Sequence, residues 1–158
     1  MIHPGTLPAV PLDQSFIGRE YPPTEPYEVG REKIREFADA VGEDSPLHRD
    51  AAAAEAAGYS DVIAPPTFAV ILSMSAQDQI VDDPKLGLDY SRVVHGSQDF
   101  AHHRPIRAGD RLITVAHVED VKTRAGNDFL TVRVEITTVE GEAVCTATSM
   151  LVVRGEEA

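Results

Sequence analysis

The stretch IAPPTFAVILSMSAQDQI, residues 63–80, joins a proline pair to a run that is apolar on nearly every side, and it decides the fold. Proline is favoured in the first turn of a helix, so Pro65 and Pro66 predict a helix that begins near Pro66. A helix that is apolar almost all round is expected where other structure surrounds it. We therefore expect this segment to be the central, buried helix of the domain.

Two shorter helices are predicted before this segment. Residues 30–43, GREKIREFADAVGE, place apolar side chains on one helical face, and Gly42 is a typical stop. The apolar side chains are Ile34, Phe37, Ala38 and Val41. Residues 49–59, RDAAAAEAAGY, are rich in alanine, the strongest helix former, and reach a second stop at Gly58.

After Pro84 the apolar pattern changes from a helical period to alternation. Residues 129–139, FLTVRVEITTV, have one apolar and one polar face, as in a strand that buries one side. The apolar face consists of Leu130, Val132, Val134 and Ile136. Residues 111–120 and 143–153 follow the same pattern, and the short turn-like links between the three segments predict an antiparallel meander.

Residues 93–106 predict one earlier strand, in which Gly96 marks a bulge or a close approach and Pro105 ends the strand. Helices that come first and strands that follow indicate an α+β domain, in which an antiparallel sheet wraps around the central apolar helix. The length of 158 residues fits one domain. We place this domain at residues 14–154, behind a flexible arm of residues 1–13.

The composition excludes several classes of protein. A formal net charge of −12 would repel nucleic acid, so we expect no nucleic-acid partner. The single cysteine, Cys145, excludes an intrachain disulfide framework and favours a reducing compartment. The sequence has neither the pattern of a secretory signal nor an apolar run of the roughly 18 residues that a membrane span needs. We therefore expect a cytoplasmic protein with no membrane partner.

The stretch VGEDSPLHRD, residues 41–50, has two interpretations. In the first it is a turn between helices, in which Asp44 and Ser45 are capping residues and His48 is exposed. In the second it brings a carboxylate and an imidazole together to move a proton, because a neutral imidazole can take a proton near pH 7. Pro46 restricts the backbone between the two groups and so fixes where they point.

The order of these segments resembles the MaoC-like dehydratases and R-specific enoyl thioester hydratases over roughly residues 15–153. The family's hallmark is a Gly-Asp-x-Asn-Pro-Leu-His run, and the positions that match it are Gly42, Pro46, Leu47 and His48. Ser45 stands at the Asn position and Glu43 at the Asp position. The family's Ile-Ala-His-Gly-Met helix entrance is replaced by IAPPT, residues 63–67. The chain is most similar to the actinobacterial MaoC N-terminal group, which resembles the A subunit of (3R)-hydroxyacyl-ACP dehydratase.

This resemblance implies a hot-dog fold and a proton-transfer site. It implies that His48 is the base and that Glu43 or Asp44 orients water, in dehydration of a (3R)-3-hydroxyacyl thioester or hydration of an enoyl thioester. A thioester enolate also needs hydrogen-bond donors, which are usually N–H groups at a helix N-terminus. Because Pro66 has no N–H, the amide of Thr67 or a neighbour would have to serve.

The expected substrate-binding residues extend from this site along the acyl chain and towards its carrier. They are Ser45, Thr67, Phe68, Ile71, Leu72, Arg104, Arg107 and Arg111. The arginines lie in the one locally basic stretch of an acidic chain and could bind a phosphate of CoA or of an acyl carrier. We expect no cofactor and no metal, since His95, His102 and His103 lack metal-ligand spacing. Strand alternation sends His102 and His103 to opposite faces, so at most one of them should share a pocket with His95.

We therefore expect a hydro-lyase component that acts on acyl-ACP or acyl-CoA, as a homodimer or as a heterodimer with a catalytic MaoC-like subunit. One alternative is a non-catalytic acyl-binding subunit that needs such a partner. A hot-dog thioesterase is the least favoured alternative, because it would need a carboxylate on the central helix, where only Asp78 lies near the far end.

Overall fold

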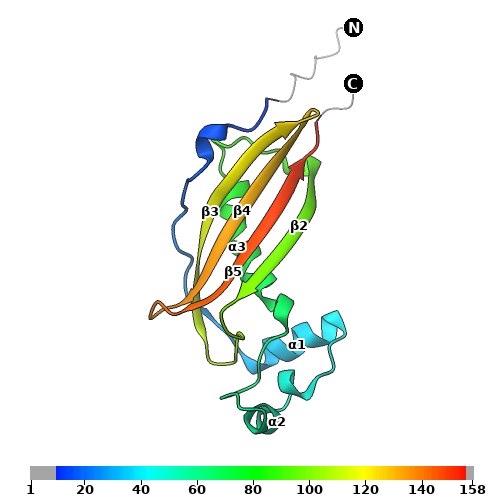
Figure 1. The fold of residues 1–158 in the computed structure, drawn as a ribbon, viewed down its shortest axis with the longest axis vertical. Coiled ribbons are helices and arrows are strands. Elements are labelled where there is room, and N and C mark those ends of the chain that lie inside the picture. The colour runs from blue at the N-terminus through cyan, green and yellow to red at the C-terminus, as the bar shows by residue number, and fades with distance from the viewer. Residues whose placement is uncertain (1–9, 156–158) are drawn as a thin grey trace.

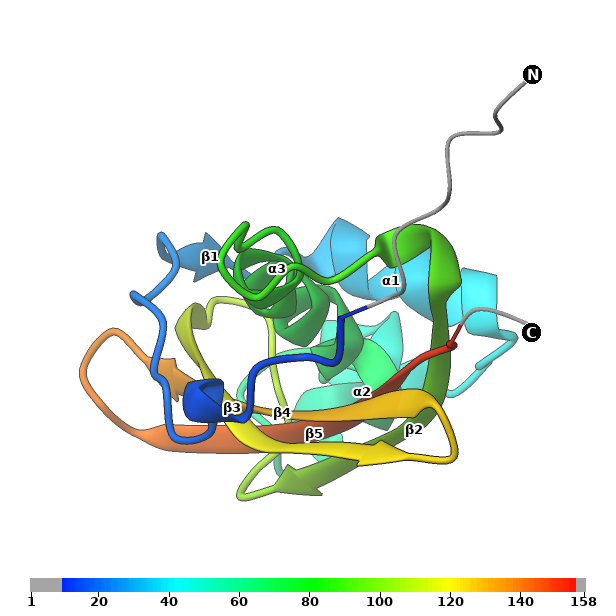
Figure 2. The ribbon, with the colours of Figure 1, turned by 90° about the horizontal axis from the view of Figure 1, so that it is seen from above.

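One curved antiparallel sheet and one long helix form the body of the protein (Figures 1 and 2). The structure is a computed structural model and describes residues 10–155. The strands of the sheet, in spatial order, are β1 (Tyr27–Glu28), β3 (Arg111–Arg124), β4 (Asn127–Thr138), β5 (Ala143–Val153) and β2 (Val93–His102). The predicted meander of the last three strands is confirmed, and the short strand β1 is an addition that the sequence pattern did not indicate.

The long helix α3 (Ala69–Val81) lies against the concave face of the sheet (Figure 2). It follows a 3₁₀ turn, η3 (Pro66–Phe68), so the helical segment begins at the proline that predicted it. Phe68, Ala76 and Ile80 are fully buried, whereas Met74 is 52% exposed. The helix is thus covered on one side only, because the sheet of a single chain curls around one face of it.

Alternation along the strands builds the core between the sheet and α3. In β4 the four apolar residues of the predicted face are buried, and Glu135 on the other face is exposed. Fully buried side chains of β3, such as Leu112 and Ala116, add to the same core. No helix within residues 10–155 is long and apolar enough to span a membrane.

The helices α1 (Arg31–Val41) and α2 (Ala51–Ala56) lie beyond one end of the sheet (Figure 1). α1 ends at Gly42, whose φ of 73° is the left-handed conformation that glycine adopts at little cost. The ring of Phe37 in α1 meets the ring of Phe68 edge to face, with 5.4 Å between their centroids. This contact holds the segment after α1 close to the beginning of α3.

Two predicted boundaries need correction. β2 ends at His102 and not at Pro105, although Gly96 does mark a bulge, where a Cβ would lie 2.7 Å from Met150 Cε. Residues 1–9 of the predicted arm are outside the described residues. Leu12, which the arm was expected to include, is 5% exposed and donates its backbone N–H to Asp128 at 3.0 Å. The packed part of the chain therefore begins before residue 14.

Candidate active site

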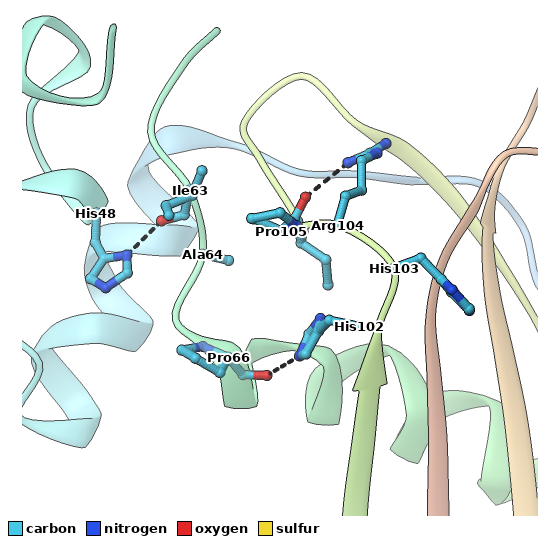
Figure 3. Close-up of a pocket in the computed structure, with 9 residues that line it drawn as sticks. His48, Ile63, Ala64, Pro66, His102, His103, Arg104 and Pro105 are labelled. Atoms are coloured by element: carbon cyan, nitrogen blue, oxygen red, sulfur yellow. Dashed lines mark hydrogen bonds between the residues drawn. The ribbon is translucent and has the colours of Figure 1, made fainter. Parts of the chain in front are cut away.

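A pocket of about 550 Å³ opens beside the beginning of α3 (Figure 3). Three chain segments form its wall: the 3₁₀ turn η2 (Pro46–His48), the stretch that leads into α3, and the loop after β2. The lining residues are His48, Ile63, Ala64, Pro66, His102, His103, Arg104, Pro105 and Ile106. The pocket is thus mainly apolar and carries three imidazoles.

Backbone hydrogen bonds hold these three segments together. Ile63 donates its N–H to the carbonyl of Leu47 at 3.0 Å, and Ala64 donates to the carbonyl of Ile106 at 2.7 Å. Ile63 also forms an isolated antiparallel bridge with Arg107. The stretch before α3 therefore lies between η2 and the loop after β2, and it fixes the distance between them.

His48 is the buried polar group of this pocket. Its side chain is only 6% exposed, and its Nδ1 lies 2.6 Å from the carbonyl oxygen of Ile63. Because a carbonyl oxygen can only accept, Nδ1 carries the proton, and the neutral ring leaves Nε2 as its basic nitrogen. No residue of the described range forms a hydrogen bond with Nε2. The imidazole is held in one tautomer, as a general base requires.

The carboxylates of the same motif are turned towards their own loop. Glu43 Oε1 accepts the backbone N–H of Ser45 at 3.2 Å, and Ser45 Oγ accepts that of Leu47 at 3.3 Å. Asp44 is exposed. Within residues 10–155, none of Glu43, Asp44 and Ser45 lines the pocket of His48. The structure thus brings the imidazole of the motif to the pocket and leaves its carboxylates outside the lining.

The expected acyl-channel residues do not line this pocket. Phe68 is fully buried in the core, and Thr67 is exposed at the start of the helical segment. Ile71 and Leu72 line a separate cavity of about 370 Å³, which lies between α3 and the segment around Tyr27. Phe68 ends the 3₁₀ turn η3 and points into the core, whereas Ile71 and Leu72 in the first turn of α3 line the other cavity.

The three arginines are all paired with carboxylates. Arg104 lines the pocket, yet its guanidinium donates to both oxygens of Asp110 at 2.9 Å and to Glu142 Oε1 at 2.9 Å. The hydrogen bonds to Asp110 raise the pKa of Arg104 further above its ordinary value. Arg107 faces the same Asp110 at 3.8 Å, and Arg111 faces Glu28 at 3.6 Å. Only Arg104 is part of the pocket wall, and there it is already neutralised.

The expectation that strand alternation sends His102 and His103 to opposite faces was wrong. His102 and His103 both line the pocket, whereas His95 lines another cavity towards the far end of α3. Alternation does not separate the first two because β2 ends at His102 and the chain bends at His103. His102 Nε2 lies 2.8 Å from the carbonyl oxygen of Pro66 (Figure 3). Within residues 10–155, no group of three His, Cys, Asp or Glu side chains could hold a metal ion.

Sequence reasoning also missed the apolar wall of the pocket. Ile63 and Ile106 reach it through the backbone pairing of two loops that lie more than forty residues apart in the chain. Neither loop has a periodic pattern that would have indicated this pairing. The Pro-Ile step after β2 was the one local signal available, since it marks where the chain leaves the sheet.

Comparison with known proteins places the chain in a family. Residues 15–147 match the family model described as FAS1-like, dehydratase domain region. A UPF0336 protein of Saccharopolyspora erythraea is 79% identical over 146 residues, which cover 92% of this chain and 94% of that protein. A UPF0336 protein of Streptomyces avermitilis is 60% identical over 146 residues, which cover 92% of this chain and 97% of that protein.

Two solved structures have the same fold and more than 30% sequence identity. A MaoC-like dehydratase is 36% identical, with a TM-score of 0.82 over 89% of this chain and 43% of that one, so this chain spans less than half of that protein. The HadBC (3R)-hydroxyacyl-ACP dehydratase complex of Mycobacterium tuberculosis is 34% identical, with a TM-score of 0.77 over 87% of this chain and 96% of that one. The chain therefore belongs to the FAS1-like dehydratase domain family, and its curved sheet around α3 is the hot-dog fold of the MaoC-like dehydratases.

Proposed function

We propose that this chain is a component of a (3R)-hydroxyacyl thioester dehydratase, or in the reverse direction an enoyl thioester hydratase, that acts on acyl-ACP or acyl-CoA. The observation that carries the proposal is His48, a buried imidazole in a mainly apolar pocket. The Ile63 carbonyl fixes its tautomer, and its basic Nε2 has no hydrogen-bond partner among residues 10–155. The family model and the dehydratase neighbours support the same reaction class.

In this mechanism His48 Nε2 takes the α-proton of the hydroxyacyl thioester. The α C–H bond breaks and a thioester enolate forms; the C3–O bond then breaks as the C=C bond forms, and the 3-hydroxyl group leaves as water with the proton that His48 Nε2 has taken. The Ile63 carbonyl remains bonded to Nδ1–H throughout and stabilises the imidazolium that forms. In hydration the same steps run in reverse.

The thioester oxygen gains negative charge in this step and needs a donor. The start of the helical segment at Pro66 supplies the favourable end of the helix dipole beside the pocket. Pro65 and Pro66 lack an N–H, so the first backbone donor of the segment that can serve is Thr67.

A second candidate is a non-catalytic acyl-binding subunit that works with a catalytic partner. It is favoured by the positions of Glu43 and Asp44, which are outside the lining of the pocket within the described residues. A partner would then supply the carboxylate that orients water. The thioesterase alternative receives no such support, since Asp78 of α3 is exposed and also lies outside that lining.

We propose that the partner, a second copy or another MaoC-like subunit, adds to the sheet along β2. This strand is an edge of the sheet and most of its ten residues are exposed. The open side of α3, with Met74 half exposed, lies next to that edge and would be covered by the same partner. The similar HadBC protein is described as a complex.

The decisive experiment is hydration of crotonyl-CoA by the full-length chain, first alone and then with a candidate MaoC-like partner. His48→Ala should lower kcat by about 10²- to 10⁴-fold, the usual contribution of a general base, without loss of the fold. Lys122→Ala, at an exposed position of β3 away from the pocket and from the β2 edge, is the control and should keep the activity. Activity that survives His48→Ala would reject the proposal.

Glu43→Gln separates the two candidates. If Glu43 orients water, this change should lower kcat as His48→Ala does. If the chain is a binding subunit, it should be inactive alone and active with the partner, and Glu43→Gln should leave the mixed activity unchanged.

A further inference from the structure

Two imidazoles hold the short segment that leads into α3, one at each end. His48 Nδ1 lies 2.6 Å from the carbonyl of Ile63, and His102 Nε2 lies 2.8 Å from the carbonyl of Pro66. Figure 3 shows the two rings on opposite sides of this segment. Both rings line the pocket, and so do Ile63, Ala64 and Pro66 of the segment. The first contact belongs to the proposed base, but the second has no part in the mechanism described so far.

The backbone donors of residues 63–68 are nearly all used. Ile63 and Ala64 donate to Leu47 and Ile106, the two prolines have no N–H, and Phe68 donates to the carbonyl of Pro65 at 2.9 Å. Thr67 is left as the one N–H of this stretch with no hydrogen-bond partner in the described part of the chain. It is in the first turn of the helical segment, where no intrahelical acceptor is available.

The free N–H of Thr67 and the carbonyl that His102 contacts belong to one peptide group. This peptide is trans, since the described chain has no cis bond, so its N–H and C=O point in opposite directions. A hydrogen bond from His102 to the Pro66 oxygen therefore also fixes the direction of the Thr67 N–H. That direction is away from His102.

We propose that His102 is a positioning residue, which orients the Pro66–Thr67 peptide so that the Thr67 N–H binds the thioester oxygen. The inference rests on the proposed function and deepens it. His102 acts through the peptide and does not touch the reacting atoms. Because a carbonyl oxygen only accepts, His102 must carry a proton on Nε2, and it can do so in both its neutral and its charged form. The hydrogen bond therefore persists when the pH changes around neutrality.

The test compares His102→Ala with His102→Gln in the full-length chain, together with its partner if activity requires one. The amide of Gln can donate to the Pro66 oxygen as the imidazole does, but it cannot transfer protons near pH 7. His102→Ala should lower kcat for crotonyl-CoA about 10- to 100-fold with little change in KM, less than the ~10²- to 10³-fold loss expected for removal of an oxyanion donor. His102→Gln should restore most of kcat and the wild-type pH profile.

Nuclear magnetic resonance adds a measurement that does not depend on turnover. In the wild type, the ¹⁵N signals of His102 should show the tautomer protonated at Nε2, and the Thr67 amide should shift when crotonyl-CoA binds. His102→Ala should weaken this shift and His102→Gln should restore it, whereas Lys122→Ala on β3 should not affect it.

These results distinguish failure of the inference from failure of the proposed function. An inactive chain whose Thr67 amide responds to crotonyl-CoA in a His102-dependent way supports the inference and rejects catalysis by this chain. The inference is overturned by a neutral ring protonated at Nδ1 or by a Thr67 amide that ignores the thioester. It is also overturned by a His102→Ala variant that keeps the wild-type kcat, or by a His102→Gln variant as impaired as His102→Ala.

Discussion

Replacement of Arg104 by methionine removes the guanidinium that neutralises Asp110 and keeps an apolar stem of similar length. Asp110 is only 7% exposed and accepts two hydrogen bonds from Arg104 at 2.9 Å. Loss of one partner of a buried ion pair costs about 3–5 kcal/mol, because the other charge stays buried without compensation. Asp110 keeps the backbone N–H of Arg107 at 2.9 Å and the Arg107 guanidinium at 3.8 Å, which favours the lower end of this range.

We therefore expect Arg104→Met to lower the free energy of unfolding by about 3 kcal/mol. For a domain of this size that corresponds to a fall in Tm of about 6–12 °C, which calorimetry or thermal unfolding followed by circular dichroism can measure. The matched control is Arg111→Met. Arg111 Nε lies 3.6 Å from Oε1 of Glu28, and both side chains of this pair are exposed. This control should change stability by about 1 kcal/mol at most.

The double variant Arg104→Met/Asp110→Asn should recover part of the loss, because no buried charge is then left without a partner. A fall of less than about 1 kcal/mol for Arg104→Met would refute the structural role of the pair. If the Arg104→Met variant had almost unchanged stability but bound acyl-CoA more weakly at low salt, the result would support the phosphate-binding role that the sequence predicted for Arg104.

Other measurements test the core and the pH dependence of stability. Phe68→Ala should cost about 3–5 kcal/mol in urea unfolding, since the ring is fully buried, and a cost below 1 kcal/mol would contradict its place in the core. Burial and the hydrogen bond to Asp83 raise the pKa of Tyr21 from 10.0 to about 12, so the neutral hydroxyl is the form that the fold favours. The stability from this shift is complete below pH 10 and is lost as the pH rises towards 12, so wild type should lose stability there relative to Tyr21→Phe. Parallel stability curves for the two proteins between these pH values would contradict the assignment.

Local patterns predicted the elements of this fold because they depend on neighbours in the chain. The apolar run that starts after Pro66 is α3, and the alternation of β4 buries the predicted side chains. The stop at Gly42 is confirmed for the same reason, since a helix end is set by the residues around it. The extent to which α3 is covered was not predictable in this way, because it depends on which layers pack over the helix.

The chemistry of the pocket depended on contacts between distant residues. The motif of residues 41–50 indicated His48, but only the fold shows that the Ile63 carbonyl fixes its tautomer and that Glu43 caps its own loop. The basic stretch indicated Arg104 as a phosphate ligand, whereas in the structure its guanidinium donates hydrogen bonds to Asp110 and Glu142.

The sequence by itself determined the helices, the meander and the imidazole of the motif, since period, caps and turn residues are local properties. The tertiary structure decided the partners of His48, His102 and Arg104. A hydrogen bond across 15, 36 or 38 residues arises only when the sheet and α3 have packed and brought three loops to one end.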